Sequence, residues 1–260
     1  MSGFLLPVWT LWRREIVRFL RQRSRVYGAL GQPVLFWILL GSGFGASFRP
    51  PGAGGEGDYL AYFYPGILAM VILFTAIFAT IATVEDRRER FLQGVLVSPA
   101  PRAAVVLGQA LGGTTLALLQ GALLLIAAPL AGISLTPASA LASAAVMALI
   151  GFALTSLGLL LAWRLDSTQG FHAVMNLLLI PLWLLSGAVF PVSGAHAWLG
   201  WVMRLNPLTY GVAALRRSLH LARPEAAGDL PALGVSLLVT LLFGLAAYLL
   251  AARTAGRSRG

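Results

Sequence analysis

Long stretches without a charged residue constrain this chain more than any other feature. Five such runs lie between Arg25 and Arg49, Asp58 and Glu85, Arg102 and Arg164, Asp166 and Arg204, and Asp229 and Arg253. A helix that crosses the hydrocarbon core of a bilayer needs about 20 apolar residues. Three runs fit one crossing each, the run after Arg102 fits two, and the run after Asp166 fits one crossing plus a shorter apolar piece.

The sequence therefore predicts an all-α membrane protein with six transmembrane helices, in a single transmembrane domain that covers residues 1–260. Helices are expected because backbone groups in lipid must be paired within the segment, and because the runs are too long and too continuously apolar for barrel strands. Pro129 and Pro137 predict the turn between the third and fourth crossings. The predicted spans are 27–47, 60–84, 104–130, 138–163, 169–190 and 230–252.

The charge balance points to membrane topology and not to nucleic acid. Nineteen basic residues, all of them arginine, face nine acidic ones, and the formal net charge is +10. The arginines lie in the gaps between apolar runs and form no single basic groove. With the N-terminus inside, most of them fall in inner segments, so the positive-inside rule predicts that both termini are cytoplasmic. An outer group after the fifth span opposes this bias and requires its own explanation.

Residues 1–26 predict an amphipathic helix that lies at the membrane surface. Leu5, Trp9, Trp12 and Ile16 recur at helical spacing, while arginines such as Arg14 occupy the other side. Such a helix buries its apolar face at headgroup depth and turns its arginines toward anionic lipid. An ordinary positive-inside flank is the simpler alternative.

The inner loop at 85–102 is the most informative segment for function. Six charged residues of mixed sign are followed by the short apolar stretch from Phe91 to Val97 and then by two prolines. A plain hydrophilic loop has no need of that apolar stretch, which suits a short helix along the membrane face. Such an element can receive force from a cytoplasmic partner.

This loop resembles the coupling helix of the type-two ABC exporter permeases, a family that includes drug, lipid and polysaccharide exporters. The resemblance rests on the charged cluster, on Leu96-Val-Ser-Pro99, on Arg102 and on the pair Leu107-Gly108. Arg90-Phe91 replaces the glycine-threonine that is usual in the family, so the local turn is expected to differ. The resemblance implies that the ATPase subunit contacts Glu85, Asp86, Arg87, Arg88, Glu89, Arg90, Phe91, Leu92, Pro99 and Arg102.

A second motif lies after the fifth span, in residues 191–217. The family has an outer re-entrant hairpin that ends in Asn-Pro-Leu-Thr-Tyr and is followed by an arginine. The matching residues here are Asn206, Pro207, Thr209, Tyr210 and Arg216. Such a hairpin accounts for the outer arginines, because they terminate a half-buried element and are not ordinary loop charges.

The resemblance implies a permease that works with two copies of an ABC ATPase subunit, a second copy of itself and membrane lipids, in a bacterial or archaeal cytoplasmic membrane. The chain has no lysine and therefore no phosphate-binding Gly-x-x-x-x-Gly-Lys-Ser/Thr loop, so ATP and Mg²⁺ are expected on the partner. It has no cysteine, its three histidines are scattered, and we expect neither a metal nor a cofactor of its own.

An uncharged path suits an amphiphilic or lipid-linked substrate. The candidate lining residues are Phe63, Tyr64, Phe74, Phe78, Phe171 and Trp183. Four glycines after the inner loop permit close helix approach, either between two copies or within the chain: Gly108, Gly112, Gly113 and Gly121.

Two other classes of protein remain open. An ion-coupled secondary transporter normally places ionisable groups at mid-membrane, where the predicted spans have essentially none. An intramembrane hydrolase needs a serine and a histidine on facing helices, and the available residues are Ser42, Ser186 and His172.

Overall fold

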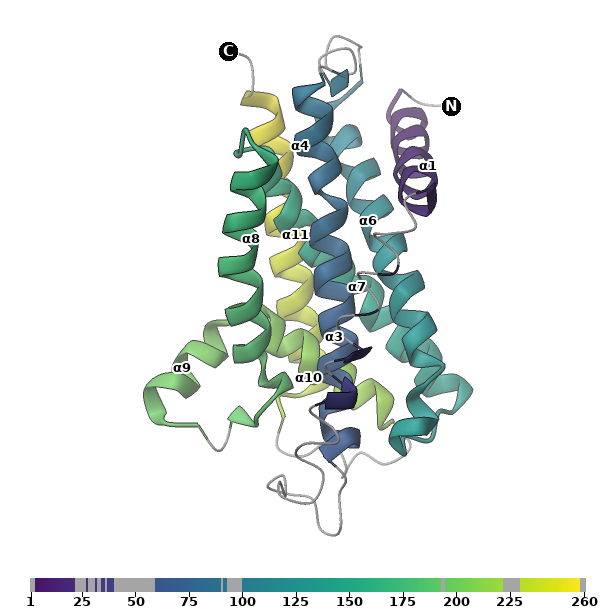
Figure 1. Ribbon diagram of the computed structural model, residues 1–260, viewed down its shortest axis with the longest axis vertical. Helices are drawn as coiled ribbons and strands as arrows, with labels where there is room; N and C mark the ends of the chain where they lie inside the picture. Colours follow the sequence, from purple (N-terminus) through teal and green to yellow (C-terminus); the bar gives the residue numbers. More distant parts are fainter. Residues whose placement is uncertain are drawn as a thin grey trace.

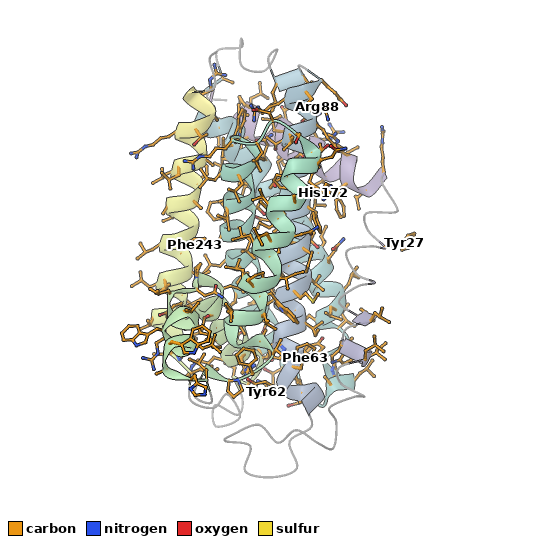
Figure 2. All side chains as sticks on the ribbon, turned by 60° about the vertical axis from the view of Figure 1, so that its left-hand side comes forward. Tyr27, Tyr62, Phe63, Arg88, His172 and Phe243 are labelled. Atoms are coloured by element: carbon orange, nitrogen blue, oxygen red, sulfur yellow. The ribbon has the colours of Figure 1, made fainter. Side chains whose placement is uncertain are left out.

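The computed structural model is a bundle of helices, and every regular element among its described residues is helical (Figure 1). It describes residues 3–21, 27, 31, 34–35, 37–39, 59–89, 91–92, 100–192, 195–221 and 230–257. The end that holds α1 (Leu5–Arg21) and α4 (Ile81–Arg88) is called the inner end below, and the opposite end the outer end. Arg88 lies near the inner end and Tyr62 near the outer end (Figure 2).

Five helices in the described part of the chain are long and apolar enough to cross a membrane. They are Ala61–Arg88, which joins α3 (Tyr59–Ala79) to α4, then α6 (Arg102–Leu125), α7 (Pro137–Ala162), Thr168–Ala188 and Leu233–Gly256. These five correspond to the second to sixth predicted spans. Most of the predicted first span, 27–47, lies outside the described residues; its described positions, 27, 31, 34–35 and 37–39, are helical.

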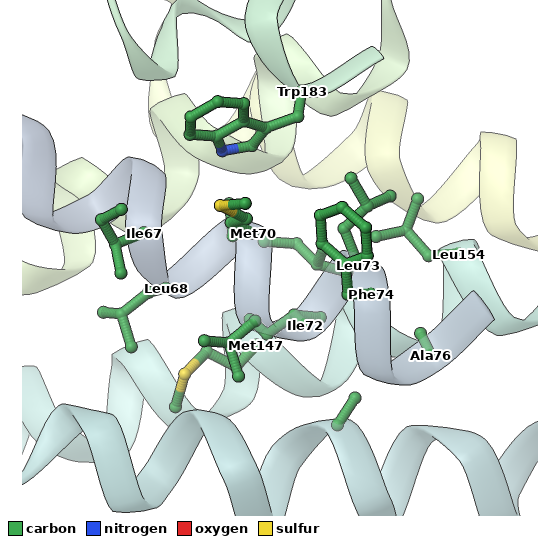
Figure 3. Packing of buried hydrophobic residues seen from close by; sticks show 14 of the residues in the cluster. Ile67, Leu68, Met70, Ile72, Leu73, Phe74, Ala76, Met147, Leu154 and Trp183 are labelled. Atoms are coloured by element: carbon green, nitrogen blue, oxygen red, sulfur yellow. The ribbon is translucent and has the colours of Figure 1, made fainter. Parts of the chain in front are cut away.

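The second span continues past its predicted end at 84, because α4 runs on to Arg88. A short break at Thr80 separates α3 from α4, and its hydroxyl donates to the carbonyl of Ile77 at 2.7 Å. This span is the centre of the bundle: 94% of its most apolar stretch is buried, against 33% for Thr168–Ala188 and 28% for Leu233–Gly256. Figure 3 shows Leu73 and Phe74 of α3 among side chains from the neighbouring helices, including Met147, Leu154 and Trp183.

The turn between α6 and α7 forms where the two prolines predict it. A 3-10 turn, η1 (Ala128–Ala131), ends at Gly132, whose φ of 73° is the left-handed conformation that glycine adopts readily. Thr136 then caps α7, since its side chain accepts from the backbone N–H of Ser139 and the Ser139 hydroxyl accepts from the N–H of Thr136.

The fifth span is irregular at its outer end. Helix α8 (Thr168–Trp183) passes into a π-helical segment, η2 (Leu184–Ala188), in which Gly187 has a φ of 76°. Two short helices follow, α9 (Ala197–Leu205) and α10 (Pro207–Leu219), before α11 (Leu233–Arg257) returns to the inner end. Helix α10 is buried along most of its length and packs against α3, α7 and α11.

The glycines that follow the inner loop serve packing within the chain. A Cβ atom at Gly108 would lie 2.8 Å from the Val8 carbonyl oxygen, and one at Gly112 would lie 2.7 Å from the Glu15 Cβ, so both glycines seat α1 on α6. Gly113 meets Thr155 of α7 in the same way. The alternative of intrachain packing, left open by the sequence, therefore accounts for these three positions.

Candidate functional site

Four charged side chains join α1 to the inner end of the central span, and we call Arg14, Arg18, Glu85 and Asp86 the inner clamp. Arg14 donates to both carboxylate oxygens of Asp86, at 2.6 and 2.7 Å. Arg18 donates to Asp86 at 2.8 Å and to Glu85 at 2.7 Å. The Asp86 side chain is fully buried, whereas the side chains of Arg14 and Arg18 are 29% and 22% exposed.

The clamp follows from helix geometry. Arg14 and Arg18 are four residues apart and therefore share one face of α1, and Glu85 and Asp86 lie in the last turns of α4. The hydrogen bond to Asp86 raises the pKa of Arg14 above its ordinary value, although burial acts in the opposite direction. The guanidinium is thus a fixed positive charge over a buried carboxylate, a short charge-assisted contact of the strong kind.

Apolar packing fixes the start of the inner loop to the same helix. Leu92 is buried in one cluster with Leu11 of α1 and Val105 of α6. The Arg14 guanidinium also lies 4.0 Å from the centroid of the Phe91 ring, within cation–π distance. The start of the loop, directly after α4, therefore packs against α1 and α6.

The residues predicted to contact an ATPase divide into two groups. The side chains of Asp86 and Leu92 are buried against α1 and α6, and Glu85 is half-buried. Arg88, Glu89 and Phe91 are exposed at the inner end. Arg102 is half-buried at the first turn of α6, and Arg90 and Pro99 lie outside the described residues.

Arg87 has a different neighbour from the rest of the charged cluster. It donates to the carbonyls of Ala162 and Leu165 at 3.0 and 3.2 Å, and to the exposed carboxylate of Asp166 at 3.0 Å. A cation near the last carbonyls of a helix is favourable. Arg87 thereby links the central span to the end of α7.

At the outer end, Asn206 links α10 to α8. Its side-chain oxygen accepts from the N–H of Leu208 at 2.9 Å and caps α10, and its Nδ2 donates to the carbonyl of Leu182 at 2.7 Å. Pro207 occupies the first helical position, where its missing N–H costs nothing. Thr209 donates to the carbonyl of Met203 at 2.6 Å, and the Tyr210 hydroxyl donates to that of Arg204 at 3.1 Å.

Replacing Asn206 with alanine is expected to lower the free energy of unfolding by about 2 kcal/mol, because the helix loses its cap and the Leu182 carbonyl loses a partner. Asn206→Ser keeps a capping oxygen and should lose about half as much. Chemical unfolding in detergent, followed by circular dichroism, measures both. Equal losses for the two variants would show that the cap does not contribute.

Arg216 is a buried cation at the outer end. Its side chain is 6% exposed, its Nη2 donates to the carbonyls of Tyr62 and Gly187 at 3.2 and 3.4 Å, and its guanidinium lies 4.1 Å from the Tyr62 ring centroid. It thus ties α10 to the start of α3 and to the π-helical segment. Sequence reasoning identified the residue through its motif but did not identify these contacts.

The aromatic residues predicted to line a path lie mostly inside the helix bundle. Phe63, Tyr64, Phe74, Phe171 and Trp183 are buried, and Phe78 is half-buried beside the His172 ring at 5.8 Å. Trp183 donates to the carbonyl of Gly66 at 2.8 Å. The buried five contact a substrate only if the helices around α3 separate, so their role in a path stays a prediction.

The structure excludes the serine–histidine pair formed by Ser186 and His172. Both residues lie on the continuous element from α8 to η2, about 20 Å apart along its axis at 1.5 Å per residue. The Ser186 hydroxyl instead donates to the carbonyl of Trp183 at 2.6 Å. Ser42 lies outside the described residues.

Comparison with known proteins identifies the family to which this architecture belongs. The model of the ABC-2 type transporter family matches residues 7–220. Nodulation protein J of Sinorhizobium fredii is 30% identical over 236 residues, which cover 89% of this chain and 85% of that protein. The transport permease ycf38 of Cyanophora paradoxa is 29% identical over 216 residues, covering 82% and 74%. The match runs from α1 through the central span and the outer helices to the end of α10, and the chain belongs to the ABC-2 type transporter family.

Proposed function

We propose that this chain is the membrane permease of an ATP-driven exporter, and that it moves an amphiphilic or lipid-linked substrate outward. A separate ABC ATPase subunit binds ATP and Mg²⁺ and docks at the inner end. The observation that carries the proposal is the exposed group Arg88, Glu89 and Phe91. These residues lie at the inner end of the central span, next to the inner clamp. Membership of the ABC-2 type transporter family supports the same conclusion.

From the contacts of the described residues we infer a route for force. A push on Arg88 or Glu89 acts directly on the end of α4, which continues into the central span. The inner clamp passes the same push to α1, and the glycine contacts of α1 pass it to α6. In the proposed assembly, two permease copies and two ATPase subunits use this route to tilt the bundle and open a path.

The distribution of buried charge favours this function over an ion-coupled transporter. Among the described residues, the buried charged side chains are Glu15, Asp86 and Arg216. Glu15 and Asp86 belong to the inner end, and Arg216 lies in the outer helix pair. Ion coupling normally uses charged groups near mid-membrane, so an energy source outside the membrane fits the described part of the bundle better.

The substrate class is proposed from the apolar character of the bundle core. The core around α3 is made of aliphatic and aromatic side chains, which do not favour a small ion or a highly charged solute. Relatives carry the names Nodulation protein J and transport permease ycf38, and the second name describes a permease without naming a cargo.

Charge reversal at the inner end tests the docking prediction. The double variant Arg88→Glu, Glu89→Arg should reduce co-purification of the permease with a tagged ABC ATPase from the same genome, because it reverses charges that complement those of the ATPase. Both side chains are exposed, so the fold should be kept. Arg253→Glu is a matched control, since this exposed arginine lies on α11 at the same end. Undiminished co-purification of the double variant, with its unfolding curve unchanged, would contradict docking at this site.

A further inference from the structure

Helix α9 presents an apolar face that no other described element covers. Trp198, Trp201, Val202 and Leu205 are 68%, 66%, 40% and 80% exposed, and their spacing of three and four residues places them on one side of the helix. Met203, on the other side, is fully buried. We call these four exposed residues the α9 stripe. An apolar helix face of this kind is covered either by lipid or by another protein surface.

The position of α9 connects the stripe to the membrane-facing surface. The helix projects sideways from the outer end of the bundle, beside the end of α8 (Figure 1), and it contacts η2 and α10. The last turns of the fifth span also expose apolar side chains, with Ile180 56% and Leu184 38% exposed. With nine residues, α9 is about 14 Å long. It is therefore too short to cross a hydrocarbon core of about 30 Å.

The chemistry of the stripe and its neighbours favours lipid as the occupant. Tryptophan is enriched at membrane–water interfaces, because its ring is apolar and its N–H is polar. Arg204 is exposed beside the stripe, and no aspartate or glutamate occurs in the segment 195–221. The positive charge of Arg204 complements lipid phosphate, whereas a second copy of the same face would bring like charges together.

We propose that α9 lies in the outer interface of the membrane and binds lipid there. The α9 stripe rests against the glycerol and upper acyl region, and Arg204 reaches toward phosphate. In this arrangement α10 is the outer helix that is buried in the protein. Helix α9 runs along the membrane surface and does not enter the hydrocarbon core. Helix α9 thereby fixes the depth of the outer end in the membrane, because Asn206 connects it directly to α8 and α10.

The chain has no cysteine, so single-cysteine variants carry a nitroxide label without background. Val202→Cys and Leu205→Cys report on the stripe and leave both tryptophans in place. In liposomes of phosphatidylcholine and phosphatidylglycerol, we expect oxygen to relax these labels more than a nickel chelate does. The two rates together should place the labels about 5–10 Å into the boundary of headgroups and acyl chains.

Matched positions calibrate the measurement. Leu238→Cys, 55% exposed on α11, should show a strong preference for oxygen, and Ser134→Cys, exposed in the turn between α6 and α7, should prefer nickel. Met203→Cys, on the buried side of α9, should be poorly accessible to both reagents. Replacing Trp198 and Trp201 together with serine should move the Leu205→Cys label toward water, and replacing both with phenylalanine should move it less.

Each other outcome overturns the proposal. A nickel preference at Val202→Cys and Leu205→Cys would place the stripe in water. Low accessibility to both reagents, together with line broadening between labels, would show that a second copy covers it. None of these readings requires an ATPase, so the result is independent of the proposed export function.

Discussion

Replacing Asp86 with asparagine is expected to lower the free energy of unfolding by about 3 kcal/mol. Removing one partner of a buried ion pair typically costs about 3–5 kcal/mol, because the other charge loses its compensation. Two guanidinium groups depend on this one carboxylate, which accepts three bonds of 2.6 to 2.8 Å. The lower end of the range applies, since Arg14 and Arg18 are partly exposed and water replaces some of the lost interaction.

Asp166→Asn is the matched control for this prediction. Asp166 also pairs with an arginine, Arg87, at 3.0 Å, but its side chain is 89% exposed. Exposed pairs contribute about 0–1 kcal/mol. Denaturant titrations of both variants in the same detergent compare the same acid-to-amide change at a buried and an exposed site. Equal small losses would mean that the inner clamp does not hold α1 in place.

The helical architecture was predictable because each span is a property of one stretch of chain. An uncharged apolar run is sufficient to indicate a membrane helix, and five predicted spans coincide with helices of the described part. The turn between Pro129 and Pro137 is a local signal of the same kind.

The inner clamp was not predictable in the same way. The second span was expected to end at 84, because Glu85 and Asp86 are charged and were assigned to the inner loop that contacts the ATPase. The structure instead pairs them with arginines about 70 residues earlier in the chain. The sequence contains the four charges and the helical spacing of the two arginines. Which arginine pairs with which carboxylate, however, depends on how α1 packs on α6. The glycines at 108 and 112 are the signal that, in retrospect, indicates such a contact.

Residue type alone also did not identify which aromatic side chains face a path. Phe63 and Tyr64 are fully buried against other helices of the same chain, and Phe78 keeps some exposure. The hydrophobic effect that places apolar residues inside a soluble protein is weak within lipid. Hydropathy therefore does not separate helix faces that meet protein from those that meet lipid or substrate.

Replacing both Gly108 and Gly112 with leucine is expected to detach α1 from the bundle. Even a Cβ atom at these positions would lie 2.8 Å from the Val8 carbonyl oxygen and 2.7 Å from the Glu15 Cβ. Overpacking a closely packed contact costs about 1–3 kcal/mol per site. The two sites are one helical turn apart on the same α1–α6 contact, so α1 relieves both by moving away, and the bond from Trp12 to Thr115 at 3.0 Å is lost with it.

Limited trypsin digestion measures this detachment, because α1 carries arginines at 13, 14, 18 and 21. These bonds should be cleaved much faster in the double variant, while the helix content of the remaining bundle changes little. Gly234→Ala is the control, because nothing lies within 4 Å of a Cβ atom there and alanine has the higher helix propensity. That variant should keep α1 protected and unfold at slightly higher denaturant. Slow cleavage of α1 in the Gly108 and Gly112 variant would show that the inner clamp alone secures the helix, in which case Asp86→Asn should expose the same trypsin sites.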